Sequence, residues 1–170
     1  MLTDLQVKEY QNIIKKLNKK NIDLIITDFD DTIFSTKELI EKDYRKWRRW
    51  QEWNEYMKNN NLFDIVVNDL YKNKSYPDII SKKLRPNHDL ILTAWNEEFQ
   101  LKKIKAINLD YINIRVVDSG EDKILETIKY IINILQFIPN KITVYEDRPE
   151  FFVKNKRLLE KLFWTTFQII

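Results

Sequence analysis

Side chains that could act chemically on a ligand follow several of the chain's short apolar runs. They are Asp28, Asp30, Asp31, Thr32, Thr93, Lys123, Glu146 and Asp147. Carboxylates crowded at one place repel one another unless a cation lies among them. The chain contains one His and no Cys, so the ligands of such a cation would be oxygen atoms. All-oxygen ligation indicates a hard ion, and Mg²⁺ is the usual one beside a phosphate group.

The apolar runs that carry these residues alternate with helical patterns, which predicts a parallel sheet covered by helices. Strands are predicted at residues 23–29, 89–95, 112–118, 141–147 and 165–170. In sheets of this kind, ligands bind at the carboxyl ends of the strands. The acidic side chains are therefore expected to meet at that edge. Lys123 would join them from the first turn of the helix that follows the third strand.

Apolar residues at helical spacing predict the helices and the domain organisation. Thr3 and Gln6 are a predicted capping box for the first helix. Further helices are predicted at 37–60, 97–108, 121–137 and 157–162. We predict a single α/β domain over residues 1–170 with one large, mostly helical insertion at about 34–87. This insertion would form a small cap or a side lobe.

The composition excludes several classes of function. A single Gly rules out glycine-rich phosphate-binding loops, and the lone His argues against a Ser–His triad. The absence of Cys removes disulfides, thiolate zinc sites and thiol nucleophiles, which suits a cytoplasmic protein. The longest apolar stretch, 130–138, contains Asn133 and Gln136, so no membrane span is expected. A net charge of +3 is too small to indicate nucleic-acid binding without a local cluster.

The motifs resemble, in order, those of the haloacid dehalogenase (HAD) superfamily. DFDDT is similar to the signature DxDxT after a hydrophobic strand, and LILT resembles the second motif. Lys123 is placed like the third-motif lysine, and VYED resembles the acidic fourth motif. The four motifs lie between residues 23 and 148. The resemblance implies a HAD-like, three-layer α/β/α Rossmannoid fold and a phosphatase activity.

The resemblance also implies a role for each matching residue. Asp28 would attack phosphorus and form an aspartyl-phosphate. Asp30 would protonate the leaving oxygen and later deprotonate the attacking water. Thr32, Thr93 and Lys123 would bind the phosphoryl oxygens and stabilise their charge in the transition state.

A metal site is implied in the same way. Mg²⁺ would be bound by Asp28, by the backbone carbonyl of Asp30 and by the pair Glu146 and Asp147. Glu146 stands where the family more usually has Asp. Which acid of the pair touches the metal directly is therefore open, and Asp147 is favoured.

The identity of the third-motif lysine is open as well, because Lys129 competes with Lys123. Lys123 is favoured because the start of its helix is expected to face the site, with Ser119 as the N-cap. Asp31 stands where many HAD proteins have Gly. Its side chain is expected to point away from the phosphate or to tune Asp30.

Two stretches of the sequence bear on the substrate. The segment YRKWRRWQEW interleaves cations and aromatic rings, a composition suited to nucleic acid: Arg45, Trp47, Arg48, Arg49, Trp50 and Trp53. The alternative is a helix that buries its tryptophans in the domain and leaves its arginines in solvent. The tetrapeptide YEDR at 145–148 resembles the fourth motif of the HAD domain in Swiss-army-knife RNA-repair proteins.

Three functions remain open from these patterns. The substrate is a nucleic-acid-end or nucleotide phosphate in one hypothesis and a small phosphorylated molecule in the second. The third hypothesis is a HAD-fold protein that binds a ligand without turning it over. The intact pair Asp28 and Asp30 argues against this third hypothesis.

Overall fold

The centre of the molecule is a five-stranded sheet in which neighbouring strands run parallel. The computed structural model describes residues 3–37, 39, 50–72 and 80–170. Its strands are β2 (Leu24–Thr27), β3 (Leu90–Ala94), β4 (Asn113–Val117), β6 (Lys141–Tyr145) and β7 (Thr166–Ile169). Their spatial order is β4-β3-β2-β6-β7. The predicted α/β class and the predicted parallel sheet are confirmed.

The register of the sheet brings the chemically active residues to one edge. Thr27, the last residue of β2, lies opposite Ile91 of β3 and Tyr145 of β6. Asp28 and Glu146 follow these paired positions directly, so both leave the sheet at its carboxyl edge. Strand β3 continues through Thr93, which is paired with β4.

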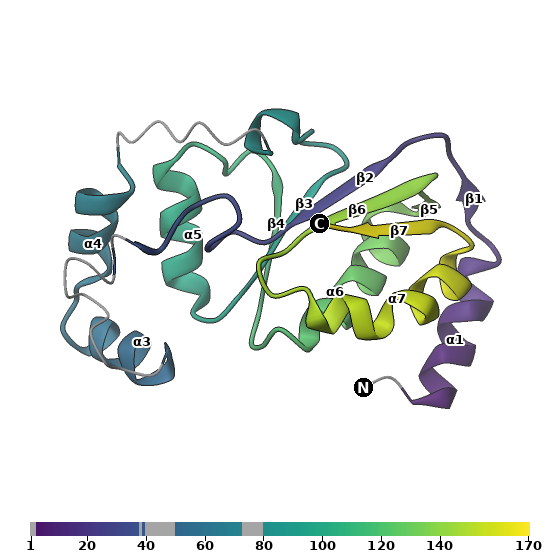
Figure 1. The fold of residues 1–170 in the computed structure, drawn as a ribbon, viewed down its shortest axis with the longest axis horizontal. Helices are drawn as coiled ribbons and strands as arrows, with labels where there is room; N and C mark the ends of the chain where they lie inside the picture. The colour runs from purple at the N-terminus through teal and green to yellow at the C-terminus, as the bar shows by residue number, and fades with distance from the viewer. Residues whose placement is uncertain (1–2, 38, 40–49, 73–79) are drawn as a thin grey trace.

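The helices form two groups (Figure 1). The first group comprises α1 (Asp4–Ile14), α6 (Asp122–Lys129) and α7 (Glu150–Phe163), and the second comprises α3 (Trp50–Asn59), α4 (Phe63–Leu70) and α5 (Glu97–Ala106). Leu90 and Leu92 of β3 belong to the hydrophobic cluster of the first group, whereas Ile91 belongs to that of the second. This alternation follows the two-residue period of a strand buried on both faces.

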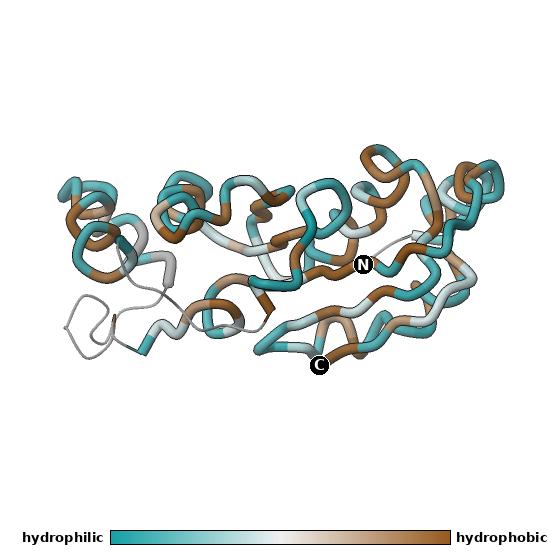
Figure 2. Tube along the Cα trace, turned by 90° about the horizontal axis from the view of Figure 1, so that it is seen from above, coloured by the Kyte–Doolittle hydropathy of each residue, from teal (hydrophilic) through white to brown (hydrophobic). Residues whose placement is uncertain are grey.

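Figure 2 shows that hydrophobic and hydrophilic residues alternate along the helices. Such alternation is typical of helices that bury one face. Within the described ranges, no helix combines the length and the apolarity that crossing a bilayer requires.

The described part of the insertion packs on α5. Trp53 and Met57 of α3 are fully buried. The ring of Trp53 contacts Phe99 of α5 edge-on at 5.4 Å, and the ring of Phe63 of α4 stacks on Phe99 at 4.9 Å. Trp53 is therefore part of the hydrophobic core, as the alternative interpretation of the tryptophan stripe expected.

Several shorter elements and helix bounds differ from the predicted ones. The predicted helix 121–137 consists of α6 and a π-helical segment, Tyr130–Leu135, which ends at Gln136 with a φ of 55°. Strand β1 (Asn18–Lys19) pairs with β5 (Phe137–Ile138) in a separate two-stranded sheet. A 3-10 turn spans Ser81–Lys83. Helix α7 starts at residue 150, directly after Pro149 and seven residues before the predicted start at 157.

Candidate active site

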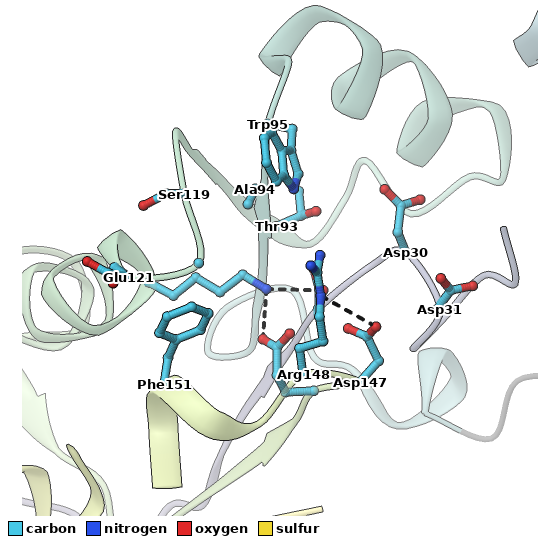
Figure 3. Close-up of a pocket in the computed structure, with 14 residues that line it drawn as sticks. Asp30, Asp31, Thr93, Ala94, Trp95, Ser119, Glu121, Asp147, Arg148 and Phe151 are labelled. Carbon is cyan, nitrogen blue, oxygen red and sulfur yellow. Dashed lines mark hydrogen bonds and ion pairs between the residues drawn. The ribbon is translucent and has the colours of Figure 1, made fainter. Parts of the chain in front are cut away.

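A pocket of about 620 Å³ opens at the carboxyl edge of the sheet. Figure 3 shows Thr93 and Trp95 on one side of it and Asp147, Arg148 and Phe151 on the other. Six of the seven residues predicted for the site line this pocket: Asp28, Asp30, Thr93, Lys123, Glu146 and Asp147. The order of the strands thus gathers residues that lie up to 119 positions apart in the sequence.

Lys123 lies between two carboxylates from different strands. Its Nζ is 3.1 Å from Oδ2 of Asp28 and 2.7 Å from Oε2 of Glu146. The lysine is the second residue of α6 and is almost completely buried. Lys129, the alternative third-motif lysine, is exposed and lines a different pocket. Of the two lysines, the structure therefore places Lys123 and not Lys129 among the residues that line the pocket at the carboxyl edge.

The turn before α6 differs from the expected capping. The N-cap of α6 is Glu121, which makes no side-chain cap bond. The prediction that Ser119 caps this helix is wrong. The Ser119 hydroxyl instead donates a hydrogen bond of 2.7 Å to the carboxylate of Asp122, the first residue of α6.

Asp28 is fixed by backbone groups on both sides of its α-carbon. Its own N–H donates to the carbonyl of Tyr145 at 2.9 Å, which continues the β2–β6 pairing by one residue. The N–H of Phe29 donates to Oδ1 at 2.7 Å. With Lys123 next to Oδ2, both carboxylate oxygens have a defined direction before any ligand arrives.

Three carboxylates gather next to Lys123. Asp28, Glu146 and Asp147 each offer one oxygen within 4.8 Å of the others. Burial, followed by the charge of Asp28, raises the pKa of Glu146 to about 8, and the same two causes raise the pKa of Asp147. A bound cation would relieve this repulsion, and a set of carboxylate oxygens fits a hard divalent ion.

Asp30 is held from behind the pocket by two residues of α5 that the sequence did not single out. Nζ of Lys103 lies 2.6 Å from both carboxylate oxygens, and Nε2 of Gln100 donates to Oδ2 at 2.9 Å. In Figure 3 the Asp30 carboxylate points away from Asp147. The sequence did contain an indication that Lys103 is buried, because Lys103 lies on the same helical face as the apolar residue Phe99.

Asp31 and Thr32 have structural contacts in the loop after Asp30. Asp31 has a φ of 58° and accepts hydrogen bonds from the backbone N–H and the hydroxyl of Thr36. The Asp31 carboxylate is therefore hydrogen-bonded within its own loop. The hydroxyl of Thr32 accepts a hydrogen bond of 3.1 Å from the N–H of Asp147. Thr32 is outside the set of pocket-lining residues, and its contact ties the loop to the end of β6.

Two aromatic residues in the pocket wall were also not predicted from the sequence. Trp95 has a φ of 89°, unusual for a residue other than Gly, and its N–H donates to the carbonyl of Val117 at 2.8 Å. Phe151 packs so closely on Gly120 that an added Cβ would lie 2.6 Å from its ring. The single glycine of the chain therefore serves to seat Phe151 in the wall.

Most of the residues considered for nucleic-acid binding are not among the residues that the structure describes. Arg45, Arg48, Arg49 and Trp47 are outside the described residues, and the same holds for the side chain of Trp50.

Comparison of the chain with protein-family models, with curated proteins and with solved structures found no match.

Proposed function

We propose that the chain is a Mg²⁺-dependent phosphomonoester hydrolase of the HAD kind, which acts through an aspartyl-phosphate on Asp28. The observation that supports the proposal best is the environment of Asp28. This buried carboxylate is aligned by the N–H of Phe29 and by Lys123, and two further acids lie within 4.8 Å. An oriented carboxylate beside a fixed ammonium group is suited to attack a phosphorus atom.

The reaction has two displacement steps at phosphorus. In the first, an oxygen of Asp28 bonds to phosphorus, the ester bond breaks, and Asp30 gives a proton to the leaving oxygen. In the second, a water molecule gives a proton to Asp30 and bonds to phosphorus, which releases Asp28 as a carboxylate. The sum is a phosphomonoester and water giving an alcohol and inorganic phosphate.

Charge on the transferred group is stabilised by the residues around Asp28. Lys123 and Thr93 line the pocket and supply an ammonium group and a hydroxyl for the phosphoryl oxygens. Mg²⁺ would be held by Asp28, by the backbone carbonyl of Asp30 and by Asp147, and it would neutralise charge on the phosphate. The contact of Glu146 with Lys123 supports Asp147 as the direct ligand.

The narrower part of the proposal concerns the substrate, for which we favour a nucleotide or a phosphorylated nucleic-acid end. Trp95, Arg148 and Phe151 line the same pocket as the acids. Aromatic rings and a guanidinium group are suited to stacking against a nucleobase. A smaller phosphorylated metabolite as substrate would leave these side chains without a ligand contact.

A phosphate-release assay tests the proposal. The substrates are 4-nitrophenyl phosphate, mononucleotides, and oligonucleotides with a 3′- or 5′-phosphate, each with Mg²⁺ and with EDTA. We expect turnover with Mg²⁺ that EDTA abolishes and added Mg²⁺ restores. The narrower proposal requires a higher kcat/KM for nucleotides or oligonucleotides than for a sugar phosphate. Absence of Mg²⁺-dependent turnover on every substrate would favour the binding protein instead.

A further inference from the structure

A completely buried lysine lies behind the pocket. The side chain of Lys103 in α5 is 0% exposed, and its Nζ is 2.6 Å from both carboxylate oxygens of Asp30. Gln100, one turn earlier, donates from the same Nε2 to Asp30 and to the carbonyl of Ala94. Asp30 itself lines the pocket and remains 14% exposed. Helix α5 thus holds this carboxylate from behind while part of it faces the pocket.

Stability alone gives a poor account of this ion pair. Burial lowers the pKa of Lys103, and the charge of Asp30 only opposes that effect. Apolar side chains of similar volume can often replace a buried ion pair without loss of stability, or with a gain. The presence of a lysine at this position is therefore better explained by what it does to Asp30.

The position of the ammonium group is fixed by three aromatic rings. Nζ of Lys103 lies 5.3 Å from the ring centroid of Phe29, 5.8 Å from that of Tyr71 and 4.8 Å from that of Phe99. These distances are in the range of cation–π contacts. Phe29 precedes Asp30 in the loop after β2, and Tyr71 directly follows α4 in the insertion. The insertion therefore contributes to the enclosure that directs Lys103 at Asp30.

We propose that Lys103 is a positioning residue, which fixes the Asp30 carboxylate in the direction from which it exchanges protons with the leaving group and with water. The inference rests on the proposed function, because it requires Asp30 to act as the acid–base group. Loss of Lys103 would leave Asp28, Lys123 and the acids of the metal site in place. Only the steps in which Asp30 gives or takes a proton would slow, so the effect on kcat/KM, which ends at departure of the leaving group, depends on that group.

A pair of substrates of similar size separates this role from a merely structural one. Phenyl phosphate releases a basic phenolate that needs a proton, whereas 4-nitrophenyl phosphate releases a weakly basic anion that does not. The value of kcat/KM reports the steps up to departure of this group. For Lys103→Met we expect a loss of at least about 10-fold on phenyl phosphate and less than about 3-fold on 4-nitrophenyl phosphate, since general acid catalysis contributes roughly 10²–10⁴-fold.

Three control variants complete the measurement. Asp30→Asn should show the same dependence on the leaving group. A double variant that combines Asp30→Asn and Lys103→Met should be no slower on phenyl phosphate than Asp30→Asn alone, because Lys103 acts through Asp30. Lys102→Met removes the neighbouring lysine, which contacts Asp64 and Glu98 near the surface, and should leave both kcat/KM values unchanged.

Gln100→Leu is the second test variant and keeps the buried lysine, in case Lys103→Met does not fold. It removes one hydrogen bond to Asp30, and we expect a smaller loss that is again confined to phenyl phosphate. An equal loss on both substrates in either folded variant would overturn the inference. A wild-type protein that hydrolyses neither substrate would overturn the proposed function and the inference with it.

Discussion

The ammonium group of Lys123 determines the charge of the pocket floor. It lies within 3.1 Å of Asp28 and within 2.7 Å of Glu146, and all three side chains are buried. Because the pKa of Glu146 is raised to about 8, this group becomes net negative, and would repel a phosphate, only when both carboxylates are ionised. Asp147, the third acid, lies at the exposed side of this group with 26% of its side chain accessible. A cation bound there would bring the site to the charge balance that phosphate binding requires.

At this scale the proposed function predicts that Lys123→Met, which keeps the length of the side chain, lowers phosphatase activity. We expect kcat/KM on 4-nitrophenyl phosphate to fall by about 10²–10³-fold, the usual loss for one donor to a charged transition state. Lys129→Met is the matched control on the same helix, because Lys129 is exposed. Equal turnover by Lys123→Met and the wild type would contradict the assigned role.

The motif residues were predictable because their place is set by strand ends. Asp28, Thr93 and Glu146 lie at the carboxyl ends of parallel strands, and that topology alone brings them to one edge. Lys103 was not predictable in this way. Its contact with Asp30 depends on which face of α5 turns toward the loop after β2, which the spacing of charged residues does not show.

At the scale of elements, one buried carboxylate joins the loop before β3 to the start of β2. Asp89 is 0% exposed, and its Oδ1 accepts a hydrogen bond of 2.8 Å from the N–H of Ile25. Its Oδ2 accepts from the backbone N–H of Arg85 at 2.8 Å and from Nε at 3.0 Å. The hydrogen bond to Asp89 is the main cause that raises the pKa of Arg85. This contact fixes the two strands whose far ends carry Asp28 and Thr93.

Asp89→Asn should therefore lower the free energy of unfolding. The amide keeps the shape but loses the charge and one acceptor, and leaving a buried hydrogen-bonding group unsatisfied costs about 1–3 kcal/mol. Urea unfolding followed by circular dichroism measures the change. Asp64→Asn is the control, because Asp64 pairs with Lys102 at the surface, and such pairs contribute roughly 0–1 kcal/mol. A loss below about 1 kcal/mol for Asp89→Asn would show that the contact does not hold the strands.

The helices show where element prediction from the sequence reaches its limit. Helix α4 lies in the insertion and was not predicted as a separate helix, although Phe63, Val66, Val67 and Leu70 have the spacing of a buried helical face. This face is fixed by packing rather than by the low helix propensity of its valines. The start of α7 was missed for a similar reason, since its first turn contains the apolar residues Phe151 and Phe152.

At the scale of the whole molecule, the α/β class, the parallel sheet and the site at its carboxyl edge followed from the alternation of apolar runs and helical patterns. The role of the insertion did not follow. Helices α3 and α4 of the insertion pack beside α5, and none of the insertion's described residues lines the pocket. Whether an insertion covers a site or enlarges a core depends on the face it packs against, and the aromatic stripe with Trp53 is compatible with both.

The central claim is that Asp28 performs covalent catalysis on a phosphomonoester, and the variant Asp28→Asn tests it most directly. The measurement is Mg²⁺-dependent phosphate release from 4-nitrophenyl phosphate by the wild type and the variant, with circular dichroism to verify that both are folded. We predict that the wild type turns over and that the variant loses at least about 10³-fold in kcat, because its amide is no nucleophile. Equal turnover by the two proteins would contradict the account.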